Sequence, residues 1–173
     1  FGCAVLVFLY GVVHARAVVP VHYTAAVGNS GHACRIVLLS DVHLGIYNGA
    51  KHLESVVNAV NAAQPDLVVI AGDLFDGSQA GAYFDRKAAA AQFRRIQAPD
   101  GVVFAAGNHD PATIDPSLRT FLRESRISML HDCGLTLGSL VIFGRNDAIS
   151  VREPDRRRPL QMVVSGYPHN HPM

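Results

Sequence analysis

RIVLLSDVHLG at residues 35–45 decides the fold, because a short apolar run that suits a buried strand ends there in polar residues. The pattern recurs in PDLVVIAGDLFD at 65–76 and in GVVFAAGNHD at 101–110. Between the first two stretches, apolar residues recur at helical spacing at Leu53, Val56, Val57 and Val60. Strands that alternate with helices predict right-handed crossovers and a largely parallel sheet, so we expect an α/β fold.

The remaining elements are predicted from the same patterns. We expect strands, the first of them buried on both faces, at Arg35–Leu39, Leu67–Ile70 and Val102–Ala105. Helices are expected at about 85–96 and 117–125, and a hairpin at Leu135–Leu137 and Leu140–Phe143. An earlier strand is predicted at Val18–Ala26, followed by a turn at 28–31.

The composition restricts the class of protein. With 49% hydrophobic and 17% charged residues among 173, the chain is no solvated disordered polypeptide, and its length suits one domain. A net charge of +1 gives no global attraction to nucleic acid, so no specific nucleic-acid partner is predicted. The three widely spaced cysteines suggest neither a disulfide framework nor a thiolate zinc site.

The N-terminal run Phe1–Val13 is apolar and uncharged, and Arg16 follows it closely. The run is either a buried core segment or the end of a membrane helix with Arg16 on the cytoplasmic side. We therefore divide the chain into an apolar N-terminal segment at 1–17, a domain at 18–150 and an irregular tail at 151–173. The charged run at 152–158 is expected to be a solvated loop.

Polar residues follow each of the three buried strands. Asp41 and His43 follow the first, Asp73 the second, and Asn108 and His109 the third. The carboxyl ends of parallel strands share one edge of a sheet, so we expect these side chains in one crevice. Carboxylate, imidazole and amide ligands suit Mn²⁺, Fe²⁺ or Zn²⁺, and two ions about 3.5–4 Å apart can share a bridging carboxylate and an attacking bridging hydroxide.

The three motifs resemble the signature of the calcineurin-like metallophosphoesterases, DxH, then GDxxD, then GNHD. They stand here as Asp41 with His43, as GDLFD at 72–76 and as GNHD at 107–110. The resemblance covers about residues 35–147 and is closest to the membrane-anchored, bacterial-type branch of the family. It implies an αββα sandwich, of which this chain supplies the first sheet and the start of the second.

The family's metal roles carry over to four positions. Asp41 and His43 would ligate the first metal, Asp73 would bridge the two metals, and Asn108 would ligate the second. The implied cofactor is a pair of divalent metal ions, Mn²⁺, Fe²⁺/Fe³⁺ or Zn²⁺.

Two further residues would act in catalysis rather than in metal binding. By resemblance, His109 would face the substrate and protonate or stabilise the leaving-group oxygen, and Asp110 would orient that imidazole. Gly72 and Gly107 would let the backbone approach the metals, and Asp76 would stabilise its loop.

The family's later metal-binding histidines are missing in recognisable form. The final residues echo an SGHxH ending only faintly, with Tyr167 in place of its first histidine, followed by His169 and His171. We therefore expect a C-terminally truncated domain. Without those imidazoles the nearby carboxylates repel one another, so the fragment should bind metal weakly and have little or no activity.

The expected function is hydrolysis of a phosphomonoester or phosphodiester through a metal-bridged hydroxide. The apolar N-terminal segment would make the protein membrane-associated, with a cytoplasmic catalytic domain and a substrate that could be lipid-linked. The alternative is a non-catalytic binding module on the same fold.

Overall fold

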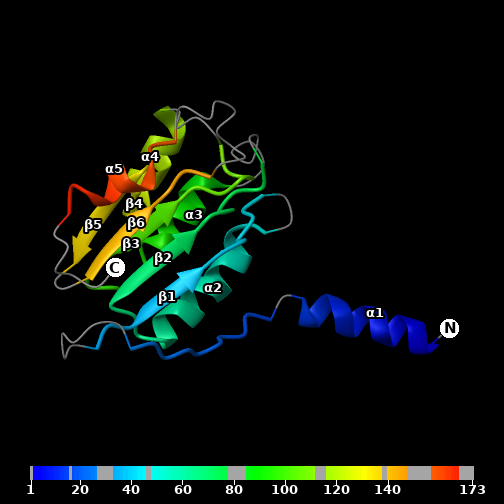
Figure 1. Cartoon of the computed structure of the whole chain (residues 1–173). Helices are drawn as coiled ribbons and strands as arrows, with labels where there is room; N and C mark the ends of the chain where they lie inside the picture. The colour runs from blue at the N-terminus through cyan, green and yellow to red at the C-terminus, as the bar shows by residue number, and fades with distance from the viewer. Residues whose placement is uncertain are drawn as a thin grey trace.

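A parallel sheet of four strands forms the centre of the molecule (Figure 1). The computed structural model describes residues 2–15, 17–26, 33–45, 48–77, 85–111, 116–137, 140–147 and 157–167. The strands follow chain order across the sheet, and all neighbours are parallel: β1 (Ile36–Leu39), β2 (Leu67–Ala71), β3 (Val102–Ala105) and β4 (Ile127–Met129). The predicted α/β fold is confirmed, although the three-residue strand β4 was not predicted.

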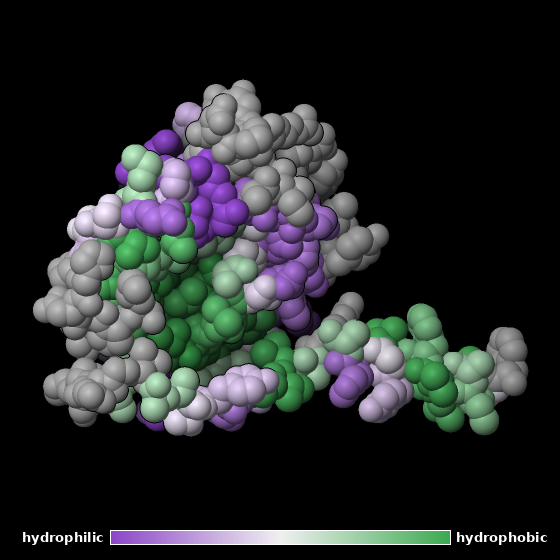
Figure 2. Space-filling model, viewed as in Figure 1, coloured by the Kyte–Doolittle hydropathy of each residue, from purple (hydrophilic) through white to green (hydrophobic). Residues whose placement is uncertain are grey.

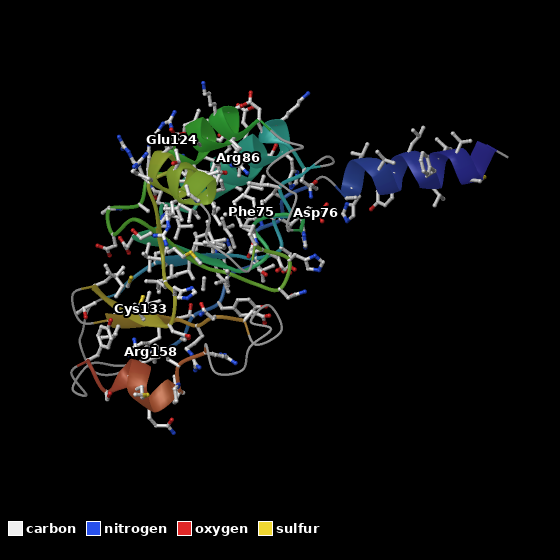
Figure 3. All side chains as sticks on the ribbon, turned by 90° about the horizontal axis from the view of Figure 1, so that it is seen from above. Phe75, Asp76, Arg86, Glu124, Cys133 and Arg158 are labelled. Atoms are coloured by element: carbon white, nitrogen blue, oxygen red, sulfur yellow. The ribbon has the colours of Figure 1, made fainter. Side chains whose placement is uncertain are left out.

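Three helices cover one face of this sheet (Figures 1 and 3). They are α2 (Ala50–Ala62), α3 (Arg86–Phe93) and α4 (Pro116–Glu124). The four apolar residues of α2 that stand at helical spacing are all buried against the sheet, as their spacing predicts. Asp85 begins α3 by accepting a hydrogen bond from the Ala88 amide, which satisfies one of the free donors of the first turn.

A two-stranded antiparallel sheet packs on the other face of the first sheet. It consists of β5 (Cys133–Leu137) and β6 (Leu140–Gly144), which confirms the predicted hairpin. Its apolar side chains contact Leu67, Val103 and Leu130. Beyond the hairpin lies the short helix α5 (Leu160–Val164), so helices, sheet, sheet and helix form successive layers in Figure 3.

Within the predicted irregular tail at 151–173, the described residues 157–167 contain helix α5 and pack on the hairpin. The Tyr167 hydroxyl accepts a hydrogen bond from Gly134 N at 2.8 Å and donates one to Gly134 O at 2.5 Å. The Tyr167 ring also meets the Phe143 ring edge-on, with 5.1 Å between centroids. The sequence did not predict these contacts, because Tyr167 lies far along the chain from Gly134 and Phe143. His169, His171 and most of the charged run at 152–158 lie outside the described residues.

Two expectations near the start of the domain are wrong. Residues 18–26 form no strand, because they have no ladder partner among the described residues, and most of their apolar side chains are exposed. Strand β1 is not buried on both faces: Ile36 is 42% exposed and Leu38 is 67% exposed. The second sheet packs on β2 and β3 and does not reach β1, which leaves the apolar surface visible in Figure 2.

The apolar N-terminal run forms helix α1 (Gly2–His14), which extends away from the domain (Figure 1). None of its residues is buried, so the expectation of a core segment is wrong. Among the described residues, no helix has both the length and the apolar character needed to cross a bilayer.

We predict that Tyr167→Phe lowers the free energy of unfolding by about 1–3 kcal/mol, because the backbone of half-buried Gly134 loses its hydroxyl partner. Urea unfolding followed by circular dichroism measures this change. Tyr23→Phe is the matched control, since Tyr23 is 91% exposed. Equal stability of the Tyr167→Phe variant and the unmodified chain would show that the hydroxyl hydrogen bonds to Gly134 do not stabilise the fold.

Candidate metal centre and active site

The loops after β1 and β2 are joined by backbone hydrogen bonds. Asp41 N donates to Gly72 O at 3.3 Å, and His43 N donates to Asp73 O at 3.0 Å. These bonds hold the first two motifs side by side at the carboxyl edge of the sheet. The third motif follows β3, the neighbour of β2, and therefore opens at the same edge.

Three of the residues predicted as metal ligands lie close together. His43 Nε2 is 3.7 Å from Asp41 Oδ1 and 4.0 Å from Asp73 Oδ2. One potential ligand atom from each of these residues lies within 4.8 Å of the other two. The structure therefore brings Asp41, His43 and Asp73 into one cluster, as the motif spacing predicts.

The third motif reaches the same cluster through Asp73. His109 N donates a hydrogen bond to Asp73 Oδ1 at 3.0 Å, and the His109 ring lies edge-on to the His43 ring, with 5.1 Å between centroids. Both Asn108 and His109 are exposed in the turn after β3. The Asn108 side chain is therefore available to a ligand next to the three clustered residues.

Asp76 belongs to this group, although the sequence assigned it only a loop-stabilising role. Its Oδ1 is 4.0 Å from His43 Nδ1, and potential ligand atoms of His43, Asp76 and His109 all lie within 4.8 Å of one another. The Asp76 amide donates a hydrogen bond to Leu44 O at 3.1 Å, which ties the loop after β2 to the loop after β1. Asp76 is labelled in Figure 3 at the side of the domain. The second aspartate of the GDxxD motif was the signal that could have found it.

The Asp110 side chain makes contacts that the sequence did not predict. Its side chain is buried, with Oδ1 accepting from Phe75 N at 2.9 Å and Oδ2 accepting from Gly107 N at 2.7 Å. Burial raises the pKa of the Asp110 carboxyl, and these backbone hydrogen bonds oppose the rise. Both oxygens thus join the second and third motifs rather than contact the His109 ring.

Close packing at the edge explains two glycines. A Cβ on Gly107 would lie 2.3 Å from Asp73 Oδ1 and 2.7 Å from Asp73 N. Gly72 has a φ of +87°, and a Cβ there would lie 3.0 Å from the Gly107 Cα. The two backbones can approach one another only because both residues lack a side chain.

Three residues at the centre have a left-handed backbone that is uncommon outside glycine. The φ angles are +56° at Asp41, +47° at His43 and +52° at Asp73. Such conformations cost free energy and persist where the surroundings impose them, as the loop hydrogen bonds do here. Among the described residues, half of the six non-glycine positions with a positive φ are therefore the residues whose side chains converge.

The donor set fits divalent metal ions. Carboxylates of Asp41, Asp73 and Asp76 surround His43, which offers a ring nitrogen among oxygen atoms. Carboxylates this close repel one another unless a cation lies between them. Oxygen and imidazole ligands are those that Mn²⁺, Fe²⁺ and Zn²⁺ accept.

Comparison with known proteins agrees with this geometry. Residues 34–153 match the family model described as calcineurin-like phosphoesterase. A Caenorhabditis elegans protein named as a metallophosphoesterase is 36% identical over 129 residues, which are 72% of this chain and 26% of that protein. A Danio rerio protein named "Transmembrane protein with metallophosphoesterase domain" is 38% identical over 58% of this chain and 21% of its own length. YkuE, an uncharacterized metallophosphoesterase of Bacillus subtilis, is 36% identical over 44% of this chain and 26% of its own.

The fold and the site thus define a phosphoesterase domain of the metal-dependent class. The chain belongs to the calcineurin-like phosphoesterase family. It spans about a quarter of the length of the curated relatives that it matches.

We predict that Gly107→Ala weakens zinc binding by at least about tenfold, because the new Cβ displaces Asp73 from the cluster. Isothermal titration calorimetry on the folded variant measures the affinity, and circular dichroism confirms the fold. Gly11→Ala is the control, since nothing lies within 4 Å of its added Cβ. Unchanged zinc affinity in Gly107→Ala would refute the tight packing at the edge.

Proposed function

We propose that this chain carries metal ligands of a phosphoesterase site that hydrolyses phosphomonoesters or phosphodiesters. The main support is the cluster of Asp41, His43 and Asp73, whose potential ligand atoms lie within 4.8 Å of one another. Asn108 and His109 follow β3 at the same edge of the sheet. Family membership supports the reaction class. The substrate and the activity of the whole protein are part of the proposal.

Four residues would hold two divalent ions, Mn²⁺, Fe²⁺/Fe³⁺ or Zn²⁺. Asp73 Oδ2 lies 4.0 Å from His43 Nε2, and Asp73 Oδ1 accepts the amide of His109, the residue after Asn108, so Asp73 stands between the first and third motifs and is proposed to bridge two ions. Bound ions supply Lewis acidity and lower the pKa of coordinated water. The same cations would neutralise the repulsion among the carboxylates.

His109 is the candidate for proton transfer to the leaving-group oxygen. Its backbone is fixed by Asp73 Oδ1, while its ring is exposed beside the cluster. A histidine imidazole at this position can donate a proton to that oxygen. We assign the orientation of this ring to Asp76, whose carboxylate lies within reach, and the positioning of the loops to Asp110.

The roles of His109 and Asp73 separate in a mutation series. In this chain, Asp73→Ala should abolish metal binding measured by elemental analysis, whereas His109→Ala should retain it. In a version extended by the family's later histidine segment, His109→Ala should lower turnover by about 10²–10⁴-fold on an alkyl phosphoester. The loss should be smaller on a nitrophenyl ester, whose leaving group needs no proton.

The matched control is Asp100→Ala, because Asp100 is an exposed aspartate that precedes β3 at the opposite edge of the sheet. If His109→Ala strips the metals, or harms both esters equally, the assigned role is wrong. Metal binding without hydrolysis of either ester would instead favour the non-catalytic binding module.

We also propose that the protein is membrane-associated through α1, with the catalytic domain on the cytoplasmic side. The helix is apolar around its circumference, and no part of it is buried in the domain. The relatives from Danio rerio and Bos taurus are named as transmembrane proteins. This association would favour a lipid-linked phosphoester as substrate.

The test is sedimentation of the chain with phosphatidylcholine vesicles. The unmodified chain should sediment with the vesicles, and the double variant Leu6→Lys with Leu9→Lys should remain in solution, because lysines oppose burial of the helix in lipid. Both leucines are more than half exposed, so the domain fold should be unaffected. Equal sedimentation of both forms would contradict the proposal.

A further inference from the structure

The segment after β4 lies next to the catalytic turn. Met129 of β4 pairs with Phe104 of β3, and Leu130 N donates to Phe104 O at 2.8 Å. The chain then continues past the carboxyl edge as His131, beside the segment that carries His109 after β3. Neighbouring strands lie about 4.8 Å apart, so His131 follows β4 at the same carboxyl edge of the sheet at which His109 follows β3.

The residue after it, Asp132, is a fully buried carboxylate with several donors. Its side chain is 2% exposed, and Arg145 Nε lies 3.1 Å from Oδ1. The backbone amides of Arg158 and Asn146 donate to it at 3.0 and 3.3 Å. Burial alone would raise the pKa of Asp132, but these hydrogen bonds and the Arg145 charge outweigh it and lower the pKa. Asp132 is therefore ionised and can only accept hydrogen bonds.

Asp132 fixes the orientation of the Asn146 side chain. Asn146 Nδ2 donates to Asp132 Oδ2 at 3.2 Å, and the Asn146 residue is 5% exposed. Reversing the amide would place its oxygen against a carboxylate oxygen, which is repulsive. The same Nδ2 lies 3.0 Å from His131 Nε2. Because Nδ2 is a donor, His131 Nε2 must accept, and the ring proton of neutral His131 is on Nδ1.

We propose that His131 presents Nδ1–H at the carboxyl edge of the sheet and binds an anionic oxygen of the phosphoester substrate, with Asn146 and Asp132 as positioning residues. The inference rests on the proposed function, since it concerns the substrate of the same site. His131 is exposed, so its ring is accessible to a ligand. His131 would thus add a neutral donor beside His109 and select phosphoesters that keep an anionic oxygen on that side.

The orientation of the His131 ring can be tested without adding metal and without measuring enzyme activity. Nitrogen-15 NMR of the chain in EDTA at about pH 8, where histidines are neutral, reports which ring nitrogen of His131 carries the proton. We expect the Nδ1–H form. Asn146→Asp, which replaces the donor with an acceptor, should move the proton to Nε2. A predominant Nε2–H form in the unmodified chain would overturn the inference, whether or not the variant folds.

The substrate contact is tested by adding zinc and then inorganic phosphate to the chain. Phosphate should shift the His131 ring resonances, and His131→Ala should weaken phosphate binding by about tenfold, as for one hydrogen bond to a charged group. His22→Ala is the control, because His22 is exposed in the segment before β1. A phosphate response at His109 without one at His131 would reject the contact and leave the proposed function standing. Failure to bind zinc at all would reject the proposed function, and the phosphate contact with it.

Discussion

Asp73 is the residue on which the rest of the site depends. Its Oδ1 accepts the His109 amide, its backbone oxygen accepts the His43 amide, and its Oδ2 lies 4.0 Å from His43 Nε2. One residue therefore aligns the motifs that follow all three central strands. The arrangement requires a backbone at Gly107 without a side chain, because a Cβ there would overlap Asp73. A parallel sheet supplies the edge at which these loops meet.

The close packing of the three motifs also brings negatively charged side chains near one another. Folding brings Asp41, Asp73 and Asp76 around His43, and three neighbouring carboxylates favour a bound cation. A bound divalent ion would remove the repulsion and would supply the Lewis acidity that the proposed hydrolysis needs. The strain in the backbone of Asp41 and Asp73 is kept by the same hydrogen bonds that align the motifs.

The sequence predicted the parts in which local pattern and tertiary packing agree. Helix α2 has strong helical periodicity, strands β2 and β3 are short apolar runs, and the polar residues after the strands identified the edge of the sheet at which the motifs meet. The exposure of β1 could not be read from its apolar sequence, because it depends on how far the second sheet extends. The contact of Asp76 with the cluster and the hydrogen bonds of Asp110 to Phe75 and Gly107 were not predicted, since motif spacing places a carboxylate in a loop without fixing its direction. The Tyr167 contact with Gly134 joins residues far apart in the chain, which no local pattern records.

We propose that Asp41, His43 and Asp73 form a metal site in this chain. Crystals of the chain grown with zinc, with diffraction measured on both sides of the zinc absorption edge, reveal where the metal binds. We expect an anomalous peak within ligand distance, about 2.0–2.2 Å, of Asp41, His43 and Asp73. Zinc found only elsewhere at saturating metal would show that these three residues do not form a metal site.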